Sequence, residues 1–218
     1  MCGDRGPLQC ALSGGMDGTG RMRVLLLSGG LDSTALAWQE RPEVALTIDY
    51  GQLPVNGEIR AARAVCQALD IRHEVLRVDC RGLGSGDLAG SAPSALAPST
   101  EWWPYRNQLL LTLAAMYAVQ VDANSLLIGT VESDSFHGDG GRSFLESMNA
   151  LLAAQEGALR VVAPALTSSS VDLIRRSGVP LEVLAWSHSC HVSEWACGSC
   201  RGCMKQLETR VSLGYESP

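Results

Sequence analysis

Short aliphatic runs alternate along the chain with longer stretches whose apolar positions recur every three or four residues. The runs are typical of buried strands, and the longer stretches are typical of amphipathic helices. We expect five strands, at residues 23–27, 44–49, 73–78, 125–129 and 159–162. We expect helices at residues 33–39, 58–69, 106–119, 144–155 and 171–176. Strands that alternate with helices pair in parallel, so the pattern predicts an α/β fold with a doubly wound, mostly parallel sheet.

Two segments lack such a period. Residues 1–21 are rich in glycine and small polar residues, and we expect them to form a flexible N-terminal extension. Residues 81–100 consist mostly of Gly, Ala, Ser and Pro, which predicts a long loop. Long loops of this kind are often lids or binding loops.

The composition narrows the classes of function. The 218 residues carry a formal net charge of −6 and are 46% hydrophobic, which is enough apolar material for a large core. An acidic chain is poorly suited to gripping long nucleic acid, so a small-molecule substrate is favoured. The sequence shows no apolar run of membrane-spanning length and no signal-peptide stretch. We therefore expect a cytoplasmic protein without membrane contact.

A glycine-rich sequence occurs twice near the N-terminus, as SGGMDGT at residues 13–19 and as SGGLDST at residues 28–34. A phosphate-binding loop needs a strand before it and a helix after it, because backbone N–H groups and the helix dipole hold the anion. The second copy follows the first predicted strand and precedes the first predicted helix. The earlier copy has only a weak strand before it and no room for a helix, so we interpret it as part of the extension.

The second copy is similar to the SGGxDS loop of ATP pyrophosphatases, the PP-loop, and it lacks the lysine of the G-x-x-x-x-G-K-[ST] loop. That resemblance implies a loop that holds pyrophosphate while AMP is transferred to a substrate. It implies that Asp32 holds Mg²⁺ and that the rest of the loop contacts ATP. The other loop residues are Ser28, Gly29, Gly30, Leu31, Ser33 and Thr34. The alternative is an ordinary helix cap preceded by a glycine turn.

Four of the eight cysteines lie close together near the C-terminus, in the pattern C-x6-C-x2-C-x2-C. In a reducing compartment this spacing favours metal ligation over disulfides. Four thiolates suit one closed, structural Zn²⁺ site, with an iron–sulfur cluster as a less favoured alternative. His188 or His191 could replace one thiolate, and unligated thiols are the remaining alternative. The four predicted ligands are Cys190, Cys197, Cys200 and Cys203.

The loop and the cysteine cluster divide the chain into three predicted parts. Residues 1–21 form the extension, and residues 22–186 form a PP-loop ATP pyrophosphatase domain. Residues 187–218 form a small zinc-binding lobe and a C-terminal helix.

Several stretches, in order along residues 23–207, resemble the 7-cyano-7-deazaguanine synthase family, which makes the nitrile precursor of queuosine. Besides SGGLDSTAL, they are DYGQ at 49–52, PYRN at 104–107, GTVESD at 129–134, APALTSSSVDLI at 163–174 and the SHSC…CGSCRGC motif. Beyond the loop, the resemblance implies nucleotide contacts from Asp49, Tyr50, Asn107 and Asp134. It implies catalytic roles for Ser28, Asp32, Ser33, Arg106 and Arg142.

The resemblance implies an ATP-dependent carbon–nitrogen ligase. Such an enzyme adenylates the carboxylate of 7-carboxy-7-deazaguanine, and ammonia displaces AMP to give an amide. A second adenylation and loss of AMP give the nitrile. The resemblance also implies ATP, Mg²⁺, a structural Zn²⁺ and a homodimer. Aligning the carboxylate with the α-phosphorus while neutralising charge would supply most of the catalysis.

The sequence departs from the family pattern at several positions. Leu53 and Pro54 stand where the family has Arg and His, Ser170 stands where it has Lys, and Tyr105 replaces a glycine. The family's YPDCR motif becomes GDGGR at residues 138–142. The loss of one cation should slow adenylation by about 10²-fold unless another residue replaces it. The candidate replacements are Arg106, Arg142, Arg175 and Arg176.

Three alternatives to nitrile synthesis stay open. A divergent relative, like those in bacterial antiviral operons, would join the deazaguanine to a protein amine as an amide. A tRNA-thiolating or lysidine-forming enzyme would share the loop, but the net charge of −6 disfavours it. A degenerate nucleotide-binding module without catalysis would explain the missing basic residues. Candidates for binding the ring, with ordinary packing as their alternative role, are Trp102, Trp103, Tyr105 and Phe136.

Overall fold

The computed structural model describes residues 22–215, which contain one five-stranded sheet whose neighbouring strands are all parallel. The strand order is β3-β2-β1-β4-β5. The strands are β1 (Met22–Leu26), β2 (Val44–Asp49), β3 (Arg72–Arg77), β4 (Ala123–Leu127) and β5 (Arg160–Val162). The predicted α/β fold with a parallel sheet is therefore confirmed. The predicted extension and the first glycine-rich copy, residues 13–19, lie outside the described residues.

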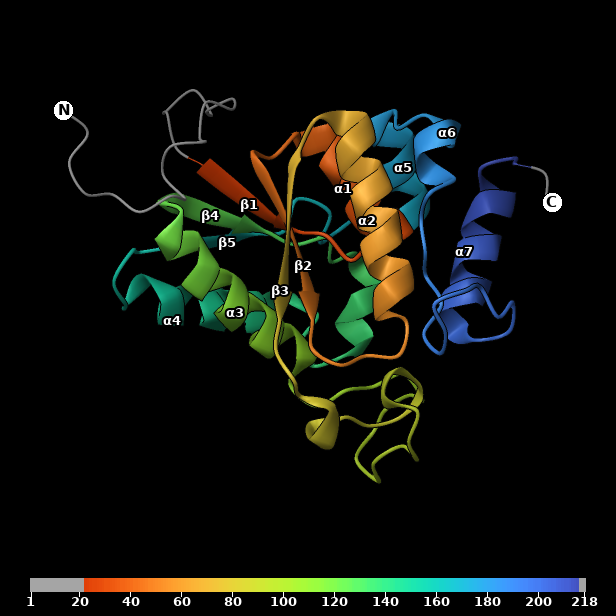
Figure 1. Cartoon of the computed structure of the whole chain (residues 1–218), viewed down its shortest axis with the longest axis horizontal. Helices are drawn as coiled ribbons and strands as arrows, with labels where there is room; N and C mark the ends of the chain where they lie inside the picture. Colours follow the sequence, from red (N-terminus) through yellow and green to blue (C-terminus); the bar gives the residue numbers. More distant parts are fainter. Residues whose placement is uncertain (1–21, 216–218) are drawn as a thin grey trace.

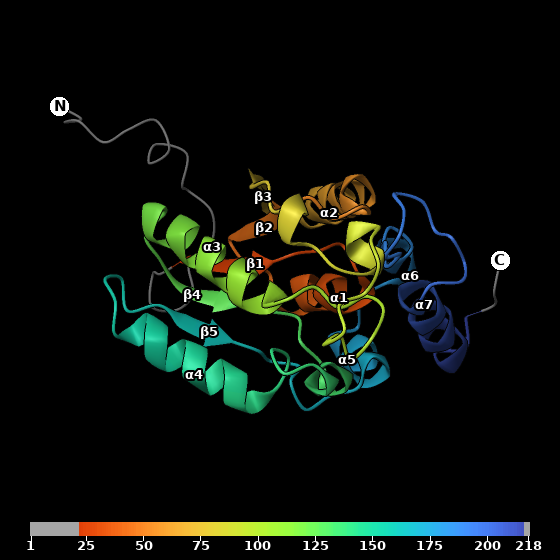
Figure 2. The ribbon, with the colours of Figure 1, turned by 90° about the horizontal axis from the view of Figure 1, so that it is seen from below.

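Helices cover both faces of the sheet (Figures 1 and 2). Helices α3 (Arg106–Gln120) and α4 (Arg142–Ala153) pack on one face, and α1 (Leu31–Glu40) and α2 (Val55–Leu69) pack on the other. The chain continues through α5 (Ser170–Ser177), α6 (Leu181–Leu184) and α7 (Arg201–Ser212). Within residues 22–215, none of the helices is long and apolar enough to span a membrane.

The central strand β1 shows why this sheet must be covered on both sides. Successive side chains of a strand point to opposite faces. Val24 and Leu26 accordingly join the core cluster under α3 and α4, whereas Leu25 and Leu27 join the cluster under α1 and α2. A continuous apolar run, rather than an alternating one, is what a strand needs when both of its faces are buried.

The strand order creates a crevice beside β1. The chain leaves β1 through α1 to β2 on one side, and later returns through α3 to β4 on the other side. Connections that diverge in this way open a space outside the carboxyl ends of the two strands, where doubly wound sheets bind ligands. The glycine-rich loop at residues 28–30 follows β1 directly and therefore lies at this point.

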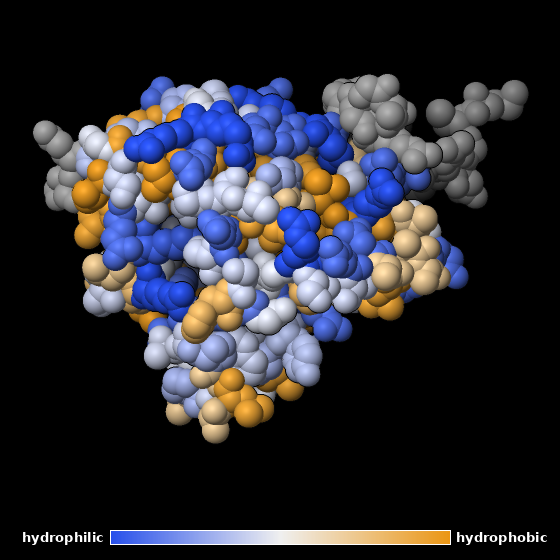
Figure 3. Space-filling view, turned by 180° about the vertical axis from the view of Figure 1, so that it is seen from behind, coloured by the Kyte–Doolittle hydropathy of each residue, from blue (hydrophilic) through white to orange (hydrophobic). Residues whose placement is uncertain are grey.

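Helix boundaries and the long loop differ in detail from the predictions. Helix α2 begins at Val55, three residues earlier than the predicted start, and α6 was not predicted. The segment 81–100 contains two short 3₁₀ turns and folds back on itself, since the Asp87 N–H donates to the Thr100 carbonyl at 2.7 Å. This segment forms the projection at the bottom of Figure 3. Its Leu83 and Leu96 side chains are exposed.

Candidate active site

The glycine-rich loop has the backbone shape of an anion-binding turn. Gly29 has a φ of +77°, a conformation that favours glycine. A Cβ at this position would come within 2.8 Å of the Ala61 Cβ and of the Glu58 carbonyl oxygen. Gly29 therefore lets the loop pack directly on α2. Gly30 then caps α1 with extended backbone, so the first N–H groups of that helix face the crevice without a capping side chain.

Hydroxyl groups line the inside of this turn. The Ser28 and Ser33 Oγ atoms lie 3.2 Å apart, and the Ser33 hydroxyl donates to the Gly30 carbonyl at 3.1 Å. Thr34 lies elsewhere, because its side chain is fully buried and its Oγ1 accepts from the Ser187 hydroxyl at 3.3 Å. The His188 N–H donates to the Gly29 carbonyl at 2.8 Å, which joins the loop to the segment that precedes the cysteine cluster.

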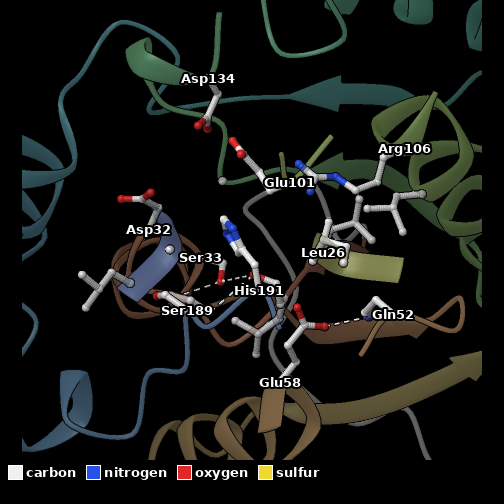
Figure 4. Close-up of a pocket in the computed structure, with 18 of the residues that line it drawn as sticks. Leu26, Asp32, Ser33, Gln52, Glu58, Glu101, Arg106, Asp134, Ser189 and His191 are labelled. Atoms are coloured by element: carbon white, nitrogen blue, oxygen red, sulfur yellow. Dashed lines mark hydrogen bonds between the residues drawn. The ribbon is translucent and has the colours of Figure 1, made fainter. Parts of the chain in front are cut away.

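A cavity of about 320 Å³ opens beside the loop. Its loop end consists of Ser28, Gly30, Leu31, Asp32 and Ser33. Its far end, defined here as Tyr50, Gln52, Glu58 and Arg106, is formed by the segments after β2 and at the starts of α2 and α3. Figure 4 shows Asp32 and Asp134 toward one side of the cavity, and Gln52 and Glu58 toward the other. The remaining wall includes Ile128, Gly129, Thr130, His137, His188, Ser189, His191, Arg201 and Lys205.

Most of the predicted site residues line this cavity. Five of the seven predicted loop residues are in the lining. The other two are Gly29, which packs against α2, and Thr34. Outside the loop, the predicted residues in the lining are Tyr50, Arg106, Asn107 and Asp134. Asp49 and Arg142 do not line it either. The Asp49 carboxylate accepts from the Gly51 N–H at 3.1 Å and pairs with Arg77 at 3.7 Å, and Arg142 is an exposed residue at the start of α4.

The four aromatic residues considered for ring binding lie outside the cavity lining. Trp103 is buried and packs edge-on against Tyr50, with ring centroids 4.9 Å apart. Tyr105 and Phe136 are exposed, 74% and 58% respectively. Trp103 therefore has the packing role, and the aromatic ring that reaches the cavity is that of Tyr50.

Two carboxylates and one ammonium group meet next to the loop end. The Lys205 ammonium donates to the Asp32 Oδ2 at 3.0 Å and lies 3.8 Å from the Asp134 Oδ1. Burial acts to lower the pKa of Lys205, but the Asp32 and Asp134 carboxylates raise it above its ordinary value. The Asp32 Oδ1 is buried and has no hydrogen-bond partner. A buried oxygen without a donor is suited to a cation, so this pair of carboxylates could hold a metal ion.

The far end holds a buried carboxyl group close to a guanidinium. The Glu58 Oε2 accepts from the Gln52 amide at 2.7 Å, and burial raises the pKa of Glu58 to about 7. Burial also raises the pKa of Tyr50, which the neighbouring Arg106 partly offsets. These groups give the far end both hydrogen-bond acceptors and a positive charge.

A second carboxylate faces the cavity from the loop before α3. The Glu101 Oε1 accepts from Arg201 at 2.7 Å and lies 3.5 Å from the His137 Nε2. The Glu101 Oε2 is buried and has no hydrogen-bond partner. The Glu101 side chain therefore adds a carboxylate to the side wall of the cavity.

The four cysteines converge on one point. Their sulfur atoms all lie within 4.8 Å of one another, and the Cys190–Cys200 and Cys197–Cys203 pairs are 3.9 Å apart. A tetrahedron with metal–sulfur bonds of about 2.3 Å has edges of about 3.8 Å, so the group could hold a metal ion. Backbone N–H groups of Ser199 and Cys200 lower the pKa of Cys197 to about 6, which favours the thiolate that a metal needs.

Sequence patterns missed several residues of the cavity, above all Glu58, Glu101, Arg201 and Lys205. Glu58 lies on a predicted helix, where only the apolar positions suggested a role. Arg201 lies within the CGSCRGC motif, in which only the cysteines suggested a role, and Glu101 and Lys205 lie outside the recognised motifs. One feature of the sequence could have pointed to Lys205 as a site residue. Lys205 is the only lysine among the 218 residues, whereas arginine is common.

Comparisons with known proteins identify the family of this chain. Residues 22–212 match the family model of the queuosine biosynthesis protein QueC. The 7-cyano-7-deazaguanine synthase of Chlorobaculum tepidum is 32% identical, over 89% of this chain and 94% of its own length. That of Methanothermobacter thermautotrophicus is 30% identical, over 89% and 96% respectively. Among solved structures, NMN synthetase from Francisella tularensis is 16% identical, covers 91% of this chain and 79% of its own, and has a TM-score of 0.49. By the match to the family model and by identity over most of its length, the chain belongs to the QueC family.

Proposed function

We propose that this protein is an ATP-dependent synthase of 7-cyano-7-deazaguanine. It adenylates the carboxylate of 7-carboxy-7-deazaguanine and transfers the activated acyl group to ammonia, which gives the amide and releases AMP. A second adenylation and loss of AMP convert the amide to the nitrile. The observation that supports this most strongly is the position of the SGGLDS loop. It follows β1 at the point where the strand order diverges, and it opens onto a cavity with charged groups at both ends. Membership of the QueC family supports the same reaction.

The loop end is suited to the pyrophosphate part of ATP. The Ser28 and Ser33 hydroxyls and the free N–H groups at the start of α1 would donate hydrogen bonds to it. Asp32 and Asp134 would hold Mg²⁺, which supplies charge neutralisation on the phosphates when bound. The carboxylate oxygen attacks the α-phosphorus, and pyrophosphate leaves with the bonding electron pair. The loop end thus holds the leaving group in place.

The far end is suited to the deazaguanine. Tyr50, Leu88 and Ile128 give apolar surface to a flat ring. The Glu58 and Glu101 carboxyl groups can accept hydrogen bonds from ring N–H groups. Arg106 would face the carboxylate that is activated, since it is the cation of the far end.

The cysteine lobe completes the proposal. Zn²⁺ is the metal that four thiolates at these distances favour, and the site would be closed and therefore structural. It would fix the start of α7, because Cys200 caps that helix and Cys203 lies in its first turn. The homodimer expected from the family resemblance belongs to the same proposal, and sedimentation of the metal-loaded protein tests it.

Mass spectrometry of the products tests the reaction. The protein is incubated with ATP, Mg²⁺, 7-carboxy-7-deazaguanine and ammonium, and AMP and pyrophosphate are measured alongside. Release of AMP together with the mass of the nitrile is the expected result. AMP release with the deazaguanine attached to a protein as an amide would instead identify the protein-conjugating alternative. Absence of AMP and of ATP–pyrophosphate exchange would leave only a nucleotide-binding module.

A further inference from the structure

One positive charge near the loop end comes from a distant part of the chain. Lys205 lies on α7, whereas the Asp32 that it contacts is the second residue of α1. The chain has a single lysine and sixteen arginines, and this one ammonium side chain lies in the cavity wall next to the loop end. An ammonium group is a compact point charge on a flexible stem, and it follows a moving phosphate more easily than a planar guanidinium does.

The other cations of the cavity lie in different positions. Arg201 is engaged with Glu101 at 2.7 Å, and Arg106 belongs to the far end beside Tyr50 and Glu58. Arg175 and Arg176 are two of the four candidate replacements for the family's missing cations. Arg175 donates to the Ser212 carbonyl, and Arg176 donates to the Ser168 hydroxyl. Neither of them lines the cavity. Among the described residues, Lys205 is thus the cation that contacts a loop-end side chain.

The Lys205–Asp32 pair is not explained by stability alone. The Lys205 side chain is 40% exposed, and a partly exposed ion pair adds little to folding. Asp32 also keeps one buried oxygen free. An ammonium group has three N–H donors, and Asp32 accepts one of them, so Lys205 can still donate to a ligand that enters the cavity.

We propose that Lys205 is a catalytic residue whose ammonium group contacts the triphosphate of bound ATP and stabilises the departing pyrophosphate. This rests on the proposed adenylation reaction. The bond from the α-phosphorus to the bridging oxygen breaks as the carboxylate oxygen bonds to that phosphorus, and negative charge grows on the pyrophosphate. Lys205 neutralises this charge without transferring a proton. The cysteine lobe acquires a role in the reaction, because Lys205 lies two residues after Cys203.

The first test compares Lys205→Met, Lys205→Arg and Arg210→Met, the last as a matched loss of charge on the same helix outside the cavity. Wild-type ATP–pyrophosphate exchange with 7-carboxy-7-deazaguanine sets the reference. We expect Lys205→Met to lower kcat by about 10²-fold, Lys205→Arg to recover part of that loss, and Arg210→Met to stay within about twofold. The urea midpoint should be the same for all. Wild-type kcat in folded Lys205→Met would overturn the proposal.

The second test does not depend on turnover. Reductive methylation modifies the Lys205 amine, which is the only lysine amine in the chain, and peptide mass spectrometry measures the extent. Mg²⁺ with a non-hydrolysable ATP analogue should slow the modification at least about tenfold, as expected for an ammonium held by phosphate. Unchanged modification at a saturating analogue concentration would overturn the contact. A wild-type protein that is protected but shows no exchange with this acid would overturn the proposed function and leave the Lys205–nucleotide contact supported.

Discussion

The loop end and the far end of the cavity are built from the chain in different ways. The residues of the loop end all come from one short stretch, 28–33, and Lys205 contacts them from α7. The shape of the stretch follows from one strand, one glycine turn and one helix start. The far end brings together the segment after β2, the first turn of α2 and the start of α3. Substitutions in the single motif alter the whole loop end. At the far end, substitutions in one segment can alter part of the site while the other two segments stay the same.

The two ends of the cavity also differ in the ligands that their chemical groups suit. The loop end offers N–H groups, hydroxyls and the Asp32 carboxylate paired with the Lys205 ammonium, groups that suit any nucleoside triphosphate. The far end offers one buried carboxyl group and one guanidinium that suit a particular acid. We therefore expect changes at the loop end to affect every ATP-dependent step, and changes at the far end to affect mainly the second substrate.

Asp32→Asn should give the largest effect, because it removes a ligand for Mg²⁺ and the partner of Lys205 together. We expect ATP–pyrophosphate exchange to fall by about 10³-fold at saturating acid substrate. Asp172→Asn, on the capped and exposed start of α5, serves as the control. Exchange within tenfold of the wild type would show that the loop end does not hold the metal through this carboxylate.

Loss of the metal from the cysteine lobe should have the next largest effect. In Cys200→Ser we expect reduced metal content by elemental analysis and a loss of exchange of about 10²-fold, since α7 no longer holds Lys205 beside Asp32. Cys80→Ser changes a cysteine outside the cluster and serves as the control. It should keep both the metal content and the exchange activity of the wild type. Full activity in the metal-free protein would show that the metal of the cysteine cluster is not needed to hold Lys205 at the loop end.

Arg106→Met should separate the two ends most clearly. We expect the KM for 7-carboxy-7-deazaguanine to rise by roughly 30-fold, because a charge-assisted contact to its carboxylate is lost. The KM for ATP should stay within about twofold. Arg210→Met is again the charge-matched control. A matching rise in both KM values would mean that Arg106 serves the nucleotide, and the division into two ends would then be wrong.

Glu58 should give the smallest effect, and it appears as pH dependence of stability. Its pKa in the folded protein is about 7, above the ordinary value of 4.5, so the folded state holds the proton more tightly. The resulting stability is complete below about pH 4.5 and is lost as pH rises through about 7. We expect this contribution to be roughly 1–2 kcal/mol, because the side chain also faces the cavity solvent.

Urea unfolding at pH 5 and pH 8 measures this slope, and Glu58→Gln should flatten it. An equal slope in the wild type and in Glu58→Gln would show that Glu58 ionises freely in the folded protein.

Sequence patterns predicted the parts of this molecule that consist of consecutive residues. The period of apolar residues placed the five strands, and the SGGLDS spacing placed the loop at the carboxyl end of β1. Thr34 shows the limit, because it belongs to the motif by spacing but turns into the core. Glu101 and Lys205 could not be placed from sequence, since their positions depend on how the segment before α3 and the cysteine lobe pack against the sheet edge.

The hydrogen bond from the His188 N–H to the Gly29 carbonyl joins a turn that the ribosome makes early to a segment that it makes late. During synthesis, β1, the turn and α1 are made before residues 188–205 exist. The nascent protein would then present an open nucleotide pocket that lacks its ammonium group. On the proposed role of Lys205, activation of the acid would begin only after translation has passed α7, and the consumption of ATP would wait for that helix.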